Sequence, residues 1–260
     1  MRTFLDCSGS SRGDLNFRLF GIPVTIKFWF WIAMLLMGGE SEPGVTIVWV
    51  AVCLVSILLH EFGHVCAFRF FGVEARAILY GFGGLAVPRR DVQGPFPRFV
   101  VSLAGPMAGF GLAALAVVAA RLSGSVVHFG WHMFLPVLSA WPHITRDTPA
   151  WSRPLYLWYV ALNDLLWVNF YWGLVNLLPV YPLDGGQAAR AVCEQRDPVH
   201  GRRNSLLLSI AFAAALAAAG LAEQSMYLVW FFGILAFSSW QALAALRRYP
   251  VAAGAHVQDD

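Results

Sequence analysis

The stretch Leu58-Leu59-His60-Glu61-Phe62-Gly63-His64-Val65 places a glutamate and two histidines inside an apolar run that extends from Val45 to Phe70. A run of this length predicts a helix that crosses a bilayer, because about 20 apolar residues cover about 30 Å of hydrocarbon. On a helix, residues four positions apart share a face, so both imidazoles can reach one ion. Ionisable groups are costly at membrane depth and are functional by default. This H-E-x-x-H pattern therefore predicts zinc bound by His60 and His64, with Glu61 as the general base.

The remainder of the chain is typical of a polytopic membrane protein. Of its 260 residues, 58% are hydrophobic and 13% are charged, whereas an ordinary soluble domain has about 25% charged residues. The expected fold class is all-α, with about six transmembrane helices and a small membrane-associated β-hairpin or sheet. The six candidate spans are residues 28–38, 45–70, 99–122, 155–178, 206–221 and 227–246. The first is short and follows Lys27, so it crosses only if that lysine snorkels to the interface.

The distribution of cations predicts the orientation in the membrane. All but three of the 18 lysines and arginines fall on one side of a six-span arrangement, the exceptions being Arg121, Arg146 and Arg153. Because cations accumulate on the cytoplasmic side, both termini are expected there. This bias explains the net charge of +3, so nothing points to nucleic acid. No cleavable signal peptide is expected, and the compact architecture favours a multi-pass protein of a bacterial inner membrane.

A catalytic zinc of this kind needs a third protein ligand and an open position for water. The candidate is Asp184, which follows Asn176-Leu-Leu-Pro-Val-Tyr-Pro-Leu at the end of the fourth apolar run. Pro179 and Pro182 break a helix, and broken backbone at membrane depth survives where it is buried in protein or lines a watery cavity. The segment that carries Asp184 is therefore expected to form one wall of the site. A helix end with a surface aspartate is the alternative, and the residues alone leave both open.

Taken together, HEFGH at 60–64 and NLLPVYPLDGG at 176–186 resemble the paired signatures of the site-2 protease family of intramembrane zinc metalloproteases. The segment Ala104-Gly105-Pro106 is similar to the A-G-P stretch of the same family, in its short form without a PDZ or CBS domain. The resemblance implies that His60, His64 and Asp184 bind one zinc ion per chain and that Glu61 is the general base. It also implies a single-pass membrane protein as substrate, cut within or near its transmembrane segment, and regulated intramembrane proteolysis as the role.

The expected organisation has three parts. Residues 1–27 form a cytoplasmic segment with a strand-like part, residues 28–195 form the catalytic transmembrane core, and residues 196–260 form two further helices and a short tail. One departure from the family pattern is Tyr181, which stands where a proline is common. That change is expected to alter the wall of the site more than its chemistry.

Several polar residues allow two readings. Asn176 is a candidate for holding the substrate or stabilising an oxyanion, and packing against another helix is the alternative. Asn169 and Asp164 are more typical of helix packing. His128 and His132 repeat the spacing of the motif in an outer segment rich in tryptophan, which favours an interfacial aromatic segment over a second metal site.

Two apolar pieces outside the helices suggest a small sheet. Residues 17–27 alternate like a strand, and residues 78–87 are too short to cross and contain several glycines. An open edge there would accept an extended substrate by strand addition, and a purely structural hairpin is equally compatible.

Other functions are less consistent with these residues. A membrane metalloprotease with a glutamate as third ligand would need a glutamate inside a later span, and Glu74, Glu194 and Glu223 fall in loops or at helix ends. A di-iron oxidase would need a second cluster of carboxylates and histidines. A non-proteolytic membrane protein that binds transmembrane helices would be expected to lack a ligand or the base. The sequence does not set the oligomeric state.

Overall fold

The computed structural model describes residues 13–38, 42–81, 83–132, 135–142 and 152–248. The chain divides into two compact units, which are described one at a time. The first comprises Met1–Val92 and Ala104–Val175, and the second comprises Gln93–Leu103 and Asn176–Asp260. Helix α3 (Pro95–Leu122) contributes residues to both.

A four-stranded sheet opens the first unit. Its strands are β1 (Leu15–Leu19), β2 (Ile22–Ile26), β3 (Ala75–Tyr80) and β4 (Gly83–Pro88), in the order β1-β2-β3-β4. The pair β2–β3 is parallel, whereas the two flanking pairs are antiparallel hairpins. Phe20 and Gly21 turn the first hairpin with φ angles of 50° and 73°, the positive values that a tight two-residue hairpin turn requires. The small sheet expected from the sequence is thus confirmed, and β1 and β4 are its edges.

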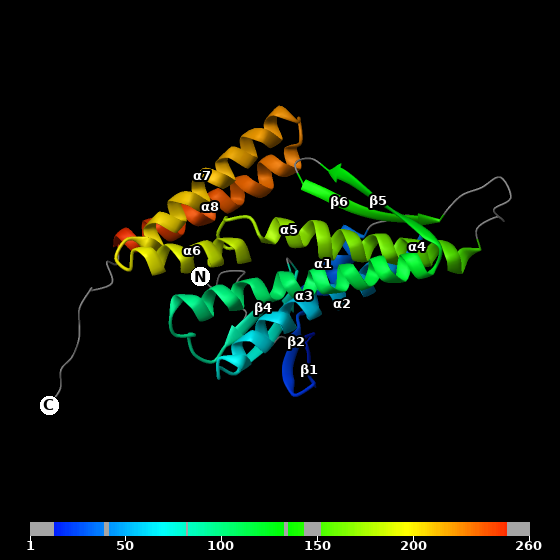
Figure 1. The fold of residues 1–260 in the computed structure, drawn as a ribbon, viewed down its shortest axis with the longest axis horizontal. Coiled ribbons are helices and arrows are strands. Elements are labelled where there is room, and N and C mark those ends of the chain that lie inside the picture. Colours follow the sequence, from blue (N-terminus) through cyan, green and yellow to red (C-terminus); the bar gives the residue numbers. More distant parts are fainter. Residues whose placement is uncertain (1–12, 39–41, 82, 133–134, 143–151, 249–260) are drawn as a thin grey trace. The chain divides into compact units, whose positions relative to one another are not determined.

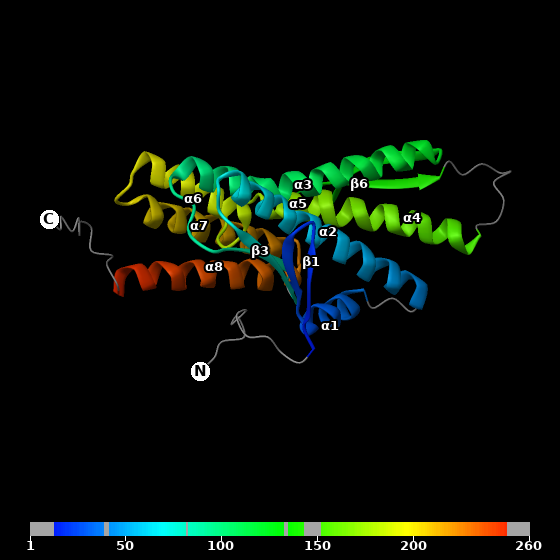
Figure 2. The ribbon, with the colours of Figure 1, turned by 90° about the horizontal axis from the view of Figure 1, so that it is seen from below.

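Helices α1 (Phe28–Met37) and α2 (Pro43–Phe70) connect the two parallel strands and cover the sheet (Figure 1). Phe30, Met34, Cys53 and Val65 are buried with the inward-facing residues of β2 and β3 in one core. The helix α4 (Arg153–Leu166), the π-helix η1 (Trp167–Tyr171) and the helix α5 (Trp172–Asn176) follow one another without a break. The turned view in Figure 2 shows them as one continuous rod.

A second β-hairpin, which the sequence did not lead us to expect, belongs to the same unit. Strands β5 (Ser125–His132) and β6 (Leu135–Pro142) pair antiparallel over their whole length. The Asn163 side chain on α4 holds this hairpin, because its amide nitrogen donates to the Ala140 carbonyl at 2.8 Å and its oxygen accepts from the Ala140 N–H at 2.9 Å. The segment from Ser125 to Pro142 therefore contains two paired strands that are docked on a helix.

The second unit contains the helices α6 (Asp184–Arg196), α7 (Gly201–Ala222) and α8 (Met226–Arg248). Helices α7 and α8 run antiparallel as a helical hairpin (Figure 1). Two glycines allow close helix approach, because a Cβ at Gly201 would collide with the Cys193 carbonyl and one at Gly220 would meet the Leu228 Cβ at 2.6 Å. Between α6 and α7, the Asp197 carboxylate accepts the N–H groups of His200 and Val199, and the His200 contact is the main cause that lowers the pKa of Asp197.

Within the described residues, four helices are long and apolar enough to cross a membrane: α2, α3, α7 and residues Met226–Leu246 of α8. This supports a multi-pass membrane protein, but the six helices expected from the sequence are not confirmed. The first predicted span is a helix of only 10 residues. The fourth is interrupted by the π-helix, which divides it into shorter elements.

Candidate metal centre

Both histidines of the motif lie on one face of α2 and point at each other. The Nε2 atoms of His60 and His64 are 3.1 Å apart, and the two rings are edge to face at 4.9 Å between centroids. His64 is 7% exposed and Glu61 is 4% exposed, whereas His60 is half-buried. Two imidazole nitrogens that converge on one point are suited to share a metal ion, and imidazole is a ligand that zinc accepts readily. The donors of this face therefore fit zinc.

The helix α3 packs closely against the histidine-bearing face of α2, because small residues lie at the contact. A Cβ at Gly63 on α2 would collide with the Ala104 carbonyl of α3, and a Cβ at Gly105 would collide with the His64 ring and lie 2.7 Å from His60 Nε2. Small residues let two helices approach closely in a membrane. Gly105 also leaves the space in which the two imidazoles stand.

Glu61 faces the edge strand of the sheet. A Cβ at Gly84 on β4 would meet the Glu61 carboxyl carbon at 2.6 Å and collide with one of its oxygens. The absence of a side chain at residue 84 therefore permits the carboxylate to lie against the backbone of an edge strand. From the sequence, Gly84 was only one of several glycines in a short apolar segment, and nothing linked it to Glu61.

A buried hydrogen bond supports the same helix one turn before His60. The Asn169 amide donates to the Ser56 hydroxyl at 2.7 Å and lies 2.9 Å from the Leu165 carbonyl. Asn169 is 3% exposed and Ser56 is 2% exposed. Since Asn169 belongs to the π-helix, the wider turn rotates it towards α2. This agrees with the packing role expected for Asn169, whereas the importance of Ser56 was missed.

In the second unit, Asp184 is the first residue of α6 and is half-buried. The preceding turn folds tightly on the helix, because a Cβ at Gly185 would collide with the Leu177 carbonyl and one at Gly186 would lie 2.6 Å from the Tyr181 nitrogen. Asn176 ends α5 before this turn and is also half-buried. Asp184 therefore begins a separate helix and is not the end of the fourth apolar run.

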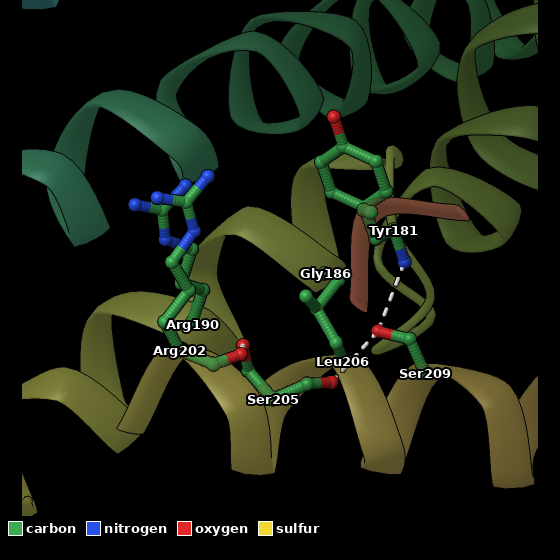
Figure 3. Close-up of a pocket in the computed structure, with 8 residues that line it drawn as sticks. Tyr181, Gly186, Arg190, Arg202, Ser205, Leu206 and Ser209 are labelled. Carbon is green, nitrogen blue, oxygen red and sulfur yellow. Dashed lines mark hydrogen bonds between the residues drawn. The ribbon is translucent and has the colours of Figure 1, made fainter. Parts of the chain in front are cut away.

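Serines of α7 and α8 fix this turn. The Tyr181 N–H donates to the Ser209 hydroxyl at 3.1 Å (Figure 3), and the Ser239 hydroxyl lies 3.1 Å from the Tyr181 carbonyl. Both serines are buried. The last two helices thus hold the backbone next to Asp184, a role that the sequence did not reveal.

The second histidine pair is part of the β5–β6 hairpin. His132 packs edge to face on Trp167 and Tyr171 of η1, at 4.9 and 5.4 Å between ring centroids. His128 is opposite Ser139 in the β5–β6 register. On a strand, residues four apart lie on one face but about 13 Å apart, so this pair does not reproduce the helical motif. An aromatic segment is the better description, as expected.

Comparison with known proteins agrees with this chemistry. The family model of peptidase family M50 matches residues 48–218, more than half of the chain. The Rip3 protein of Mycobacterium tuberculosis is 30% identical over 207 residues, which cover 75% of this chain and 44% of Rip3. The zinc metalloprotease MJ0392 of Methanocaldococcus jannaschii is 23% identical over 69% of this chain and 45% of that protein.

The fold also resembles a solved structure. The site-2 protease from Methanocaldococcus jannaschii matches with a TM-score of 0.53 and 18% identity, over 88% of this chain and 95% of that one. At this identity the likeness concerns the fold alone. The chain spans less than half the length of the curated relatives that it matches.

Proposed function

Because the chain belongs to peptidase family M50, we propose that it is a zinc peptidase that cuts membrane proteins within or near their transmembrane segments. Family membership confirms the resemblance in the two sequence signatures and supports the proposal of zinc metallopeptidase chemistry. The specific proposal rests on one observation, the convergence of the His60 and His64 nitrogens beside the buried Glu61 on a helix long and apolar enough to cross a membrane.

We assign Asp184 as the third ligand. Two imidazoles and one carboxylate form a ligand set that zinc accepts, and three protein ligands leave the fourth position for water. Support comes from the sequence signature and from the rigid turn that precedes Asp184 in its own unit. A zinc ion bound there would lower the pKa of a water molecule and polarise the substrate carbonyl.

Glu61 acts as the general base in this proposal. One of its carboxylate oxygens takes a proton from the water as the water oxygen attacks the carbonyl carbon. The same oxygen returns the proton to the leaving nitrogen as the C–N bond breaks, which yields a carboxylate and an amine. Burial beside β4 excludes bulk water from the carboxylate.

The edge strand β4 is the proposed docking place for the substrate. Its register with β3 leaves the other edge without a strand partner in the four-stranded sheet. An unwound substrate segment added at that edge would pass beside Gly84 and hence beside Glu61. Asn176 stays a proposed contact to the substrate or its oxyanion, by the amide chemistry expected from the sequence.

We further propose that six segments cross the membrane. The run of helix from Arg153 to Asn176 is roughly 36 Å long, enough for about 30 Å of hydrocarbon. The short α1 starts from the sheet, where the Lys27 N–H donates to the Leu79 carbonyl, and ends beside α2, where Thr46 Oγ1 donates to the Gly38 carbonyl. In this proposal the sheet forms part of the membrane crossing, so that α1 spans a shorter distance than a complete transmembrane helix.

The proposal is tested with purified chain in liposomes that contain a single-pass membrane protein. Wild type should cut it, and Glu61→Gln should lower the rate at least about a hundredfold, the usual size of general-base catalysis. Glu61→Gln should retain one zinc per chain, whereas Asp184→Asn should lose zinc.

Asp164→Asn is the matched control, since it makes the same change at an aspartate of α4 outside the proposed ligand set and should keep the metal. Cleavage by Glu61→Gln at the wild-type rate would contradict the base assignment. Equal loss of zinc in Asp164→Asn and Asp184→Asn would remove Asp184 as a specific ligand. Binding of the substrate by wild type without any cleavage would favour the non-proteolytic alternative.

A further inference from the structure

A small cavity in the second unit brings two arginines together next to the turn that carries Asp184. It measures about 40 Å³ and is lined by Tyr181, Gly186, Arg190, Arg202, Ser205, Leu206, Ser209 and Ala242. Figure 3 shows the guanidinium groups of Arg190 and Arg202 at the same end of this cavity. Since one water needs about 10–15 Å³ of such volume, the space suits an oxyanion of a few heavy atoms.

The charges around this cavity do not balance. Arg190 Nε donates to Glu194 Oε1 at 2.6 Å, and Arg98 shares the same carboxylate through Oε2 at 2.9 Å. Within residues 152–248, no acid pairs with Arg202. Asp197, the acid nearest to it along the chain, is engaged by the N–H groups of Val199 and His200 and forms an ion pair with His200.

Two guanidinium groups that share a cavity repel each other unless an anion lies between them. Arginine matches phosphate with two parallel hydrogen bonds, and the cavity adjoins the first turn of α7, where partial positive charge also favours an anion. Arg202 belongs to this turn, and Ser205 is the first residue after it. The cavity thus presents two guanidinium groups, and the residues that line it include no acid.

We propose that Arg190 and Arg202 bind a phosphate group in this cavity. Helix α7 has the length and hydropathy of a membrane span and begins at this cavity. A ligand at the start of such a span lies at headgroup level, where basic pockets bind anionic lipids. The chemistry recognised is a phosphate anion, carried by an anionic phospholipid or free in solution.

Occupation of the cavity stabilises the neighbouring turn. Tyr181 and Gly186 line the cavity, and they flank Asp184 in the sequence. Ser209 lines it as well and holds the Tyr181 N–H. A bound phosphate therefore restrains the backbone on both sides of Asp184, which makes the stability of the unit depend on the surrounding lipid.

The test uses the full chain, freed of lipid in a neutral detergent. Binding and the midpoint of thermal unfolding are measured with phosphatidylglycerol, phosphatidylcholine and inorganic phosphate as separate additions. We expect phosphatidylglycerol to bind and to raise the midpoint, and phosphatidylcholine to do neither. Binding of inorganic phosphate as well would identify a general phosphate site, and its absence would identify a lipid site.

The variant Arg202→Gln should weaken the binding of phosphatidylglycerol by at least about fivefold, the effect of one cation near a lipid surface. Arg203→Gln is the matched control, since Arg203 is exposed like Arg202 but does not line the cavity. Unfolding midpoints without lipid show whether each variant is folded. If both variants weaken the binding of phosphatidylglycerol equally, the effect is due to diffuse surface charge and the proposed site is wrong. The proposal is also wrong if the wild type does not bind phosphatidylglycerol. None of these readouts depends on peptidase activity.

Discussion

Gly105 is the residue whose replacement should most directly disturb the metal centre. A methyl group at this position would collide with the His64 ring and lie 2.7 Å from His60 Nε2, so the imidazoles must turn away from each other. We expect Gly105→Ala to bind zinc at least about tenfold more weakly, the loss found when ligand orientation is disturbed. Zinc content after dialysis against a chelator measures this.

Gly111→Ala is the control for that experiment. It lies on the same helix, and a Cβ there meets nothing within 4 Å. Both substitutions raise helix propensity, by up to about 1 kcal/mol, so a difference in zinc content between them reports the collision. Normal zinc content in Gly105→Ala would show that the imidazoles adjust freely.

The substitution Gly84→Ala should disturb the general base Glu61 without disturbing the binding of zinc. A methyl group here would collide with the Glu61 side chain, which supplies its three nearest atoms. Gly84→Ala should therefore keep zinc and lose at least about tenfold in cleavage rate, since small displacements of a catalytic group are costly. Gly130→Ala, whose Cβ would have ordinary contact at 3.8 Å in the other hairpin, should keep both properties. Loss of zinc in Gly84→Ala would place its effect on the ligands.

At the level of elements, the contact between α2 and the π-helix rests on Ser56 and Asn169. We expect a double-mutant cycle of Ser56→Ala and Asn169→Ala to give a coupling free energy of about 0.6 kcal/mol, the average for hydrogen bonds between membrane helices. Unfolding in detergent by a graded denaturant measures it. Ser239→Ala with Asn169→Ala is the control pair, because the two residues belong to different units, and the two effects should add. A coupling near zero in the first pair would mean that the bond contributes nothing to folding.

The sequence predicted the elements that depend on local pattern and missed those that depend on contacts distant along the chain. The helix with His60 follows from apolar length, and the presence of a small sheet follows from two short apolar segments, one of which alternates like a strand. The hairpin β5–β6 does not, since its order depends on Asn163 and on His132 stacking against η1. The π-helix likewise could not be predicted, because a single π-helical turn leaves no repeating pattern of apolar residues in the sequence.

The same division applies to the candidate site. The spacing of His60 and His64 predicts a shared ligand face because a helix repeats locally. The functions of Gly84 and Gly105 could not be predicted, since what a glycine makes room for lies on another element. For Asp184, the two prolines predicted the broken backbone, but its position at the start of a new helix required the structure.

For the whole molecule, the bias of cations predicts that the turn between α6 and α7 is cytoplasmic and that the turn between α7 and α8 is on the outer side. Val199 is 75% exposed in the first turn, and Glu223 is exposed in the second. Each is changed to cysteine in a chain whose four native cysteines are replaced. A thiol reagent that does not cross membranes should label Glu223→Cys in intact cells, and Val199→Cys only after the membrane is opened.

The two positions are separated by one helix of 22 residues, roughly 33 Å at about 1.5 Å per residue. That length matches the hydrocarbon layer, so opposite labelling is the necessary consequence of a spanning α7. Labelling of both sites in intact cells would mean that α7 does not cross the membrane. The proposed phosphate site would then not lie at the level of the lipid headgroups. Reversed labelling would keep the span but invert the predicted orientation, and both termini would then be expected outside, against the distribution of arginines.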